Sequence, residues 1–221
     1  SMSYLPQPSM LQAYAQGILD DVSAFTIATH IESCPKCRQQ VQQFEMQCGE
    51  ELVSESVDSN LDLESMFEQI VCLEQNSEPL RPPRLPTFIE VNDKTFRLPL
   101  SLTRFRDKIG EWKSYGGKVY SASIEISEQA RINLMYISED VTIPQHTHKG
   151  LESTLVLHGG FSDEDGHYEV GDYLLKDGSV KHSPFTRAGE DCLCLTVLTE
   201  PMLFTQGVAR VFNLFGKGMY P

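Results

Sequence analysis

A histidine and two cysteines near the start of the chain form the first group of residues that could bind a metal. His30, Cys34 and Cys37 follow the spacing H-x3-C-x2-C. His30 and Cys34 are four residues apart and lie on one side of a helix end, and Pro35 favours the start of the next helix. Imidazole and thiolate together favour Zn2+ over hard ions such as Mg2+. The pattern therefore predicts a zinc site, with two buried thiols at a helix junction as the alternative.

The fourth ligand of this site stays open. A structural zinc normally has four ligands, and no other histidine lies within residues 1–90. Cys48 is eleven residues beyond Cys37 on one predicted helix, which is too far to share an ion. Asp20, Asp21 or a water molecule could complete the site, so its occupancy is also left open.

A second group of metal-ligand residue types lies in the C-terminal half. His146, His148 and Glu152 have the spacing H-x-H-x3-E, and they share one face of a regular strand if a turn follows His148. His182 is available as a fourth ligand. Three imidazoles and a carboxylate inside a β-barrel can bind Zn2+, Fe2+, Mn2+, Ni2+ or copper. The alternative is a set of surface histidines on strands.

The other histidines and cysteines are interpreted as structural. By strand parity His158 faces the barrel interior, where a buried and hydrogen-bonded side chain is favoured over a group that supports the metal ligands. Cys192 and Cys194 lie two apart on one strand and face the same way, and core packing is favoured over oxidant sensing. Cys48 and Cys72 are predicted to be core thiols on helix faces.

The site at His30, Cys34 and Cys37 requires helices to position it. The apolar periodicity of the N-terminal third predicts such helices. Four helices are predicted. The first has Ser9 as its N-cap, the second covers 21–32, the third begins at Pro35, and the fourth covers 60–74. The next stretch, 76–86, contains four prolines and cannot continue a helix, so it is interpreted as a linker.

Strands must hold the second site, and beyond the linker the apolar period changes to two. The clearest predicted strands cover 120–126, 131–137, 153–158 and 192–198, with a turn after the third at Gly159. Many short strands with glycine-rich turns indicate a sandwich or a barrel. We therefore predict an α+β chain with a small helical bundle over 1–75, a linker over 76–90 and an all-β barrel over 91–221.

Charge limits the classes of partner. The 221 residues include 31 acidic and 18 basic ones, a formal net charge of −13, and residues 1–75 hold 12 acids against only Lys36 and Arg38. Direct binding of nucleic acid needs a basic face, so the composition argues against it. The acidic N-terminal third favours a basic partner, with a solvated helical surface as the alternative. Without a membrane-spanning run or a secretory signal, we expect a cytoplasmic protein.

The N-terminal motif resembles that of the zinc-binding anti-sigma domain. In that family an acidic helical domain with H-x3-C-x2-C wraps an extracytoplasmic-function sigma factor and blocks its contact with polymerase. The resemblance implies zinc at His30, Cys34 and Cys37. The family's fourth ligand is usually a histidine just before the first helix, where this chain has Leu5-Pro-Gln-Pro-Ser9.

The C-terminal motif is similar to the two motifs of the cupin superfamily. The first motif matches from His146 to Gly159, with Asp140 in place of its leading glycine. The second matches at Gly171 and His182, while Asp177 and Thr186 replace its usual proline and asparagine. The resemblance implies a double-stranded β-helix barrel with His146, His148, Glu152 and His182 as metal ligands.

The order of the two modules resembles the ChrR type of anti-sigma factor along nearly the whole chain. This resemblance implies a cytoplasmic regulator that binds an extracytoplasmic-function sigma factor, holds one Zn2+ in each domain and senses oxidative stress of the singlet oxygen or peroxide type. No residue is assigned a catalytic role. The alternative is a cupin metalloenzyme, a dioxygenase or isomerase using Fe2+ or Mn2+. Cupin barrels often pair, so a homodimer is also open.

Overall fold

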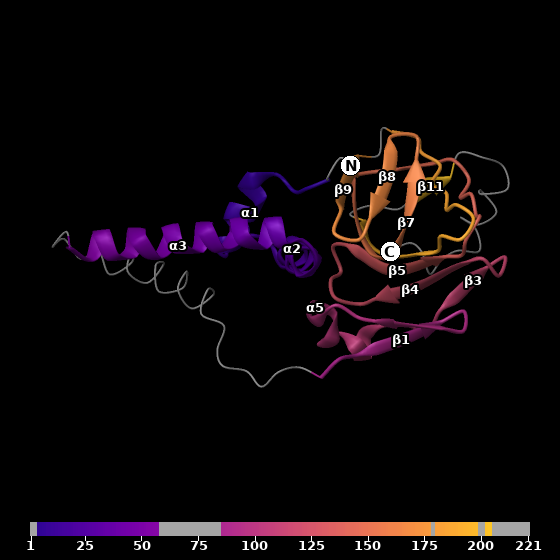
Figure 1. The fold of residues 1–221 in the computed structure, drawn as a ribbon, viewed down its shortest axis with the longest axis horizontal. Helices are drawn as coiled ribbons and strands as arrows, with labels where there is room; N and C mark the ends of the chain where they lie inside the picture. The colour runs from indigo at the N-terminus through magenta and orange to yellow at the C-terminus, as the bar shows by residue number, and fades with distance from the viewer. Residues whose placement is uncertain (1–3, 58–84, 178–179, 199–201, 205–221) are drawn as a thin grey trace. The chain divides into compact units, whose positions relative to one another are not determined.

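The computed structural model describes residues 4–57, 85–177, 180–198 and 202–204 (Figure 1). They form two units. One is the helical unit, within residues 6–85, and the other contains the strands from Pro86 onward together with Tyr4 and Leu5. The predicted helix over 60–74, with Cys72, lies outside the described residues.

The helical unit contains α1 (Pro8–Ala15), α2 (Asp21–Ser33) and α3 (Pro35–Val57). Helix α1 begins one residue before the predicted cap, because Pro8 occupies its first turn, where a fixed φ and a missing N–H cost nothing. Ser9 is therefore inside the helix and is not its N-cap. Asp20 caps α2, and its Oδ2 accepts a hydrogen bond of 3.0 Å from the Ser23 backbone N–H. The apolar core comprises Leu11, Ala15, Phe25, Ile27 and Val41.

The second unit is built almost entirely of antiparallel strands. They are β1 (Phe88–Val91), β2 (Lys94–Arg97), β3 (Lys113–Tyr115), β4 (Val119–Ile124), β5 (Arg131–Ile137), β6 (His146–His148), β7 (Leu151–Asp163), β8 (Gly166–Glu169), β9 (Tyr173–Asp177), β10 (Cys192–Leu198) and β11 (Met202–Phe204). Two short helices, α5 (Leu100–Thr103) and η1 (Arg106–Lys108), connect β2 to β3.

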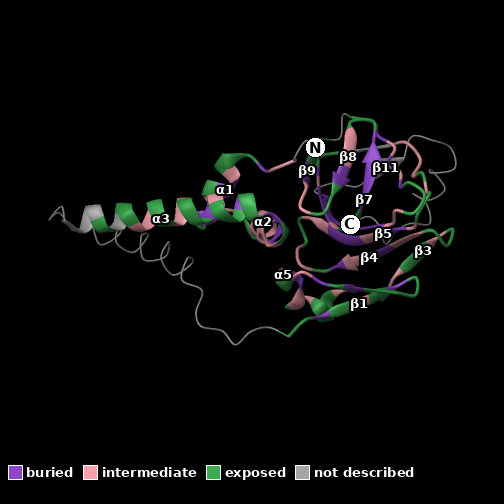
Figure 2. Ribbon diagram, in the orientation of Figure 1, coloured by how far each residue is buried: buried purple, intermediate pink, exposed green. Residues whose placement is uncertain are grey.

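The main sheet has the order β3-β4-β5-β10-β7-β8, and β9 also pairs with β7. β6 pairs with β11, and β1 pairs with β2. In Figure 1 the strands of this unit curl around one another, and Figure 2 shows that much of β7 is buried. Every residue of β10 is buried as well. No helix among the residues that the structure places is both long and apolar enough to cross a membrane.

Two apolar clusters lie on opposite faces of the main sheet. The inner cluster contains Val156, Phe161, Tyr168, Leu174, Cys192 and Cys194 among others. The outer cluster joins Val91 and Phe96 of the β1–β2 hairpin to Tyr136 and Leu193 of the sheet. Asn92 and Asp93 connect the two hairpin strands with positive φ angles of 50° and 59°, as a two-residue turn that matches the sheet twist requires.

A β-bulge in β7 changes which side chains face the interior. Leu193 of β10 pairs with His158, but Cys194 pairs with Val156, so Leu157 is an extra residue in β7. Before the bulge Glu152 faces the interior cavity. Beyond it the parity reverses, so the prediction that His158 faces inward is wrong. Its ring lies 4.7 Å from that of Phe96 in the outer cluster.

Gly159 does not turn the chain as predicted, because β7 continues to Asp163. Its φ is +67°, and a Cβ at this position would overlap the carbonyl oxygen of Asp191. The glycine is therefore required by the close approach of the neighbouring segment at the bulge, and not by a reversal of the chain.

Candidate metal centres

The junction of α2 and α3 brings His30, Cys34 and Cys37 together. His30 lies in the last turn of α2, Cys34 follows the helix as its C-cap, and Cys37 lies in the first turn of α3. Their candidate ligand atoms all lie within 4.8 Å of one another, and all three residues are buried. Among the residues that the structure describes, this is the one group of histidine, cysteine and acidic side chains with such geometry.

The protonation states in this cluster suit a soft metal ion. Burial lowers the pKa of His30 to about 4, so its imidazole is neutral near pH 7 and can donate a lone pair. Burial, and then the hydrogen bond with Cys34, raise the pKa of Cys37 to about 12, so a metal must displace the thiol proton. One nitrogen and two sulfur donors form a set that Zn2+ favours, which agrees with the donor chemistry expected from the sequence.

Asp20 is already engaged as the N-cap of α2. Its hydrogen bonds with Ser23 lower the pKa of its carboxyl group. A carboxylate that caps a helix would have to give up this bond to bind a metal, so Asp20 is a poor fourth ligand.

The second candidate centre is a cavity of about 60 Å³ in the strand unit. Its polar lining consists of Glu152, Thr154, Asp163, Lys176, His182 and Thr196. Strand β7 positions Glu152, and the segment between β9 and β10 positions His182. Both are buried, with 9% and 5% of their surface exposed. The structure thus brings two of the four predicted ligands to one cavity.

His146 and His148 form the two ends of β6, opposite Phe204 and Met202 of β11. Their side chains lie outside what the structure describes. Their participation in a metal site with Glu152 therefore stays a prediction.

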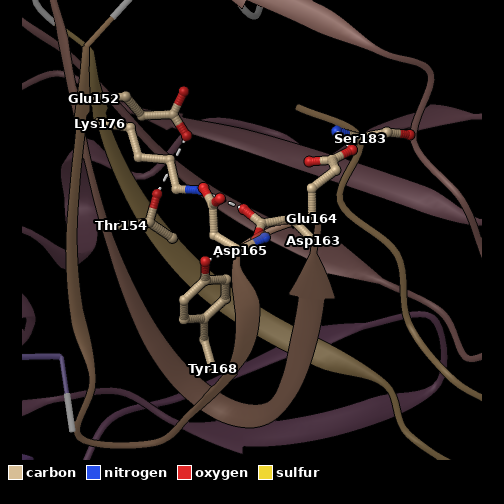
Figure 3. A network of polar contacts seen from close by, with 8 residues as sticks. All are labelled: Glu152, Thr154, Asp163, Glu164, Asp165, Tyr168, Lys176 and Ser183. Atoms are coloured by element: carbon tan, nitrogen blue, oxygen red, sulfur yellow. Dashed lines mark hydrogen bonds and ion pairs between the residues drawn. The ribbon is translucent and has the colours of Figure 1, made fainter. Parts of the chain in front are cut away.

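A network of charged side chains that the sequence analysis missed lies against the same cavity (Figure 3). Lys176 forms ion pairs with Asp163 and, at 3.0 Å, with Asp165. Tyr168 donates a hydrogen bond of 2.7 Å from its hydroxyl to Asp163 Oδ1. Lys176 also pairs directly across the sheet with Glu152, so the ammonium-bearing residue and the candidate ligand are neighbours on adjacent strands.

The ion pair is well formed despite its burial. Burial alone would raise the pKa of Asp163, but hydrogen bonds from Lys176 and Tyr168 lower it overall. Burial likewise opposes the charge of Lys176, while its bonds to Asp163 and Asp165 raise its pKa. Both groups are therefore charged near pH 7, and the side chain of Asp163 is fully buried.

The cysteines of the strand unit behave as predicted. Cys192 and Cys194 are buried and both belong to the inner cluster, and Cys194 also lines the cavity. A hydrogen bond with Cys194, and then burial, raise the pKa of Cys192, so this thiol stays protonated. Cys48 differs from its prediction, because it is half-buried and disulfide-bonded and is not a free core thiol.

Comparisons with known proteins bear on both units. Residues 123–201 match the family described as the ChrR cupin-like domain. Over 213 residues the chain is 28% identical to the anti-sigma-E factor ChrR of Cereibacter sphaeroides, covering 94% of each protein. A crystal structure of Rhodobacter sphaeroides SigE in complex with the anti-sigma factor ChrR superposes with a TM-score of 0.60 and 26% identity. That match covers 90% of this chain and 99% of the other.

These similarities establish the fold class. The chain combines an N-terminal helical part with a C-terminal cupin-like part of β-sheet, as the α+β prediction states. The family match includes Glu152 and His182, the two candidate ligands that line the cavity.

Proposed function

The chain is a homologue of the ChrR-type anti-sigma factors along almost its whole length, and from this premise we propose that it sequesters a sigma factor. The partner would be of the extracytoplasmic-function class. The helical domain, residues 1–75, would bind it, and the cupin domain, residues 91–221, would regulate that binding. The observation that carries the proposal is the continuous match across both domains to a protein crystallised with its sigma factor. Such a partner works beside RNA polymerase, so the proposal includes a cytoplasmic location.

The surface of the helical unit supports a protein partner. Met46 and Val53 are seven residues apart on α3, and therefore lie on the same side of the helix. They are 66% and 64% exposed, so two apolar side chains face solvent on a segment otherwise rich in acidic residues. Exposed apolar side chains with acidic surroundings suit a partner whose binding face is apolar at its centre and basic at its rim.

We further propose one Zn2+ in each domain. The N-terminal ion would bind His30, Cys34 and Cys37, whose geometry and neutral imidazole favour it. The cupin ion would bind His146, His148, Glu152 and His182, and Fe2+, Mn2+ or Ni2+ are alternatives with this donor set. Bound there, the ion would tie together the strands that carry its ligands. Oxidative stress of the singlet oxygen or peroxide type is the proposed signal, as the resemblance to ChrR-type regulators implies.

Calorimetric titration of the full chain against each extracytoplasmic-function sigma factor of its genome tests the binding. We expect one of them to bind, and the variant M46D/V53D to bind at least about tenfold more weakly. V180D is a matched control, because Val180 is exposed in the cupin domain.

The proposed function is wrong if the folded wild-type chain binds none of these sigma factors. Iron in the cupin domain together with oxygen consumption would then favour the metalloenzyme alternative. Equal sigma binding by wild type and M46D/V53D would instead reject the side of α3 that carries Met46 and Val53 as the contact surface.

A further inference from the structure

The residues just before the helical unit are attached to the strand unit. Tyr4 accepts a hydrogen bond of 2.9 Å at its carbonyl oxygen from the Tyr173 backbone N–H, on β9. Its own backbone N–H lies 3.5 Å from Asp172 Oδ1. Its ring packs edge-on against Tyr168 of β8, with 4.7 Å between the ring centroids. Tyr4 thus covers the β8–β9 side of the inner apolar cluster.

The docking position of Tyr4 requires a glycine opposite it. A Cβ at Gly166 would overlap the Tyr4 hydroxyl oxygen, while the carbon that bears this hydroxyl would be 3.5 Å away. The second distance is an ordinary van der Waals contact. The fit between Gly166 and Tyr4 therefore depends on the hydroxyl oxygen alone, which provides a specific way to test the contact.

The docked ring is connected to the cavity through two further contacts. Tyr168, on which Tyr4 packs, donates its hydroxyl hydrogen bond to Asp163. Asp163 forms the ion pair with Lys176, and Lys176 is the cross-strand partner of Glu152. Asp163 therefore orients Tyr168, which supports Tyr4, and also Lys176 beside the candidate ligand in the cavity.

We propose that Tyr4 and Leu5 form a strap whose docking is coupled to the state of the cupin cavity. Any ligand that orders Glu152 and Lys176 also orders Asp163 and Tyr168, and so favours a docked strap. By linkage, the docked strap favours the ligand by the same factor. Tyr4 lies four residues before the first residue of α1. The chain passes between the helical unit and the cupin domain twice, and release of the strap would lengthen the first of these two connections.

Only the effect of strap release on the helical unit rests on the proposed function. The docking and its coupling to the cavity are tested without a sigma factor. The readout is hydrogen exchange of the Tyr173 amide, followed by NMR in the full chain. We expect G166A to exchange about tenfold faster than wild type, because the added methyl displaces the Tyr4 ring. Y4F should exchange like wild type. The double variant Y4F/G166A should return towards wild type, because it lacks the overlapping oxygen.

The coupling is measured on the same amide. Zinc loading should slow exchange of the Tyr173 amide in wild type. The cupin domain of G166A should bind zinc several-fold more weakly than that of wild type. Y4F/G166A should recover the wild-type zinc affinity. Without any metal, K176M should accelerate exchange of the Tyr173 amide more than it accelerates exchange of the Leu195 amide, which reports the global loss of stability. K181M, at an exposed position, should accelerate neither. Slow exchange of the Leu195 amide in β10 verifies that each variant is folded.

Equal Tyr173 exchange in wild type and G166A, or no recovery in Y4F/G166A, would overturn the docking. Unchanged exchange in K176M, or equal acceleration of the Tyr173 and Leu195 amides, would overturn the coupling. A cupin domain that binds no zinc at all would reject the proposed metal site, while the strap would still be decided by the K176M result. Loss of sigma binding with an intact strap would likewise reject only the proposed function.

Discussion

His158 Nε2 lies 2.9 Å from Asp191 Oδ1 on the outer face of the main sheet. Asp191 also accepts hydrogen bonds of 2.7 Å from Lys94 Nζ and from the Tyr136 hydroxyl. The three donors come from β7, β2 and β5, so one carboxylate joins the β1–β2 hairpin to two strands of the sheet. Burial alone would raise the pKa of Asp191, but these three hydrogen bonds lower it overall.

Replacing Asp191 should therefore destabilise the cupin domain in a pH-dependent way. We expect D191N to lower the free energy of unfolding by about 2 kcal/mol near pH 7. Because the folded-state pKa lies below the unfolded value of about 3.9, the contribution of the carboxylate is present above that pH. It is lost as the pH falls through the folded-state pKa. Urea unfolding between pH 3 and 7 measures this, with D107N at an exposed site as control.

Gly159 should tolerate no side chain. We expect G159A to cost about 3 kcal/mol or more, because a positive φ and an overlap with the Asp191 carbonyl add together. G189A is the matched control, since Gly189 has a φ of +78° but open space around its missing side chain. It should cost about 1 kcal/mol, the conformational part alone. Equal losses in thermal or urea unfolding would mean that the bulge relaxes to accept a methyl group.

Local signals made much of the fold predictable. The predicted strands 131–137 and 192–198 coincide with β5 and β10, because continuous β-branched and aliphatic residues are bounded by clear breaks. The sequence also predicted the helix junction, because such a junction is set by residues close in sequence. It predicted the start of α3 at Pro35 and the grouping of His30, Cys34 and Cys37.

The interior of the cupin domain was less predictable, because strand register is not local. One extra residue at Leu157 reverses the parity of everything beyond it in β7, and this depends on pairing with β10. Parity therefore misplaced His158, and gave no reason to place Asp163 in the interior. A lysine and an aspartate apart in sequence carry no signal that they form a buried pair, as Lys176 and Asp163 do.

The parity reversal gives a selective prediction for the cupin metal. We expect E152Q and H182A each to abolish or strongly weaken metal binding in the cupin domain, because both side chains line the cavity. H158Q should retain the metal, because His158 points to the outer face. Metal content by plasma mass spectrometry after dialysis measures all three. Retention of the cupin metal by E152Q and H182A would show that the ion binds elsewhere.

The N-terminal cluster should bind zinc with release of at least one proton. The raised pKa of Cys37 keeps its thiol protonated without metal, whereas His30, with a pKa of about 4, has no proton to lose above pH 6. Zinc affinity should therefore rise with pH between 6 and 8. Calorimetry in buffers of different ionisation enthalpy counts the protons. C37S should lose this zinc, while C194S, in the cupin domain, should keep it. An affinity independent of pH would contradict thiolate ligation by Cys37.

Removing one partner of the Lys176–Asp163 pair should lower the free energy of unfolding more than replacing both partners with apolar residues. K176M leaves the buried carboxylate of Asp163 without its cation, and we expect a loss of about 3–5 kcal/mol in the free energy of unfolding. The double variant K176M/D163L removes both charges together, so it should recover most of that loss, although the Tyr168 hydroxyl then lacks its acceptor. Urea unfolding of the wild type, K176M, D163L and K176M/D163L gives the complete double-mutant cycle. A double variant as unstable as the sum of the single variants would show that the two residues stabilise the domain independently, and that Asp163 does not require Lys176.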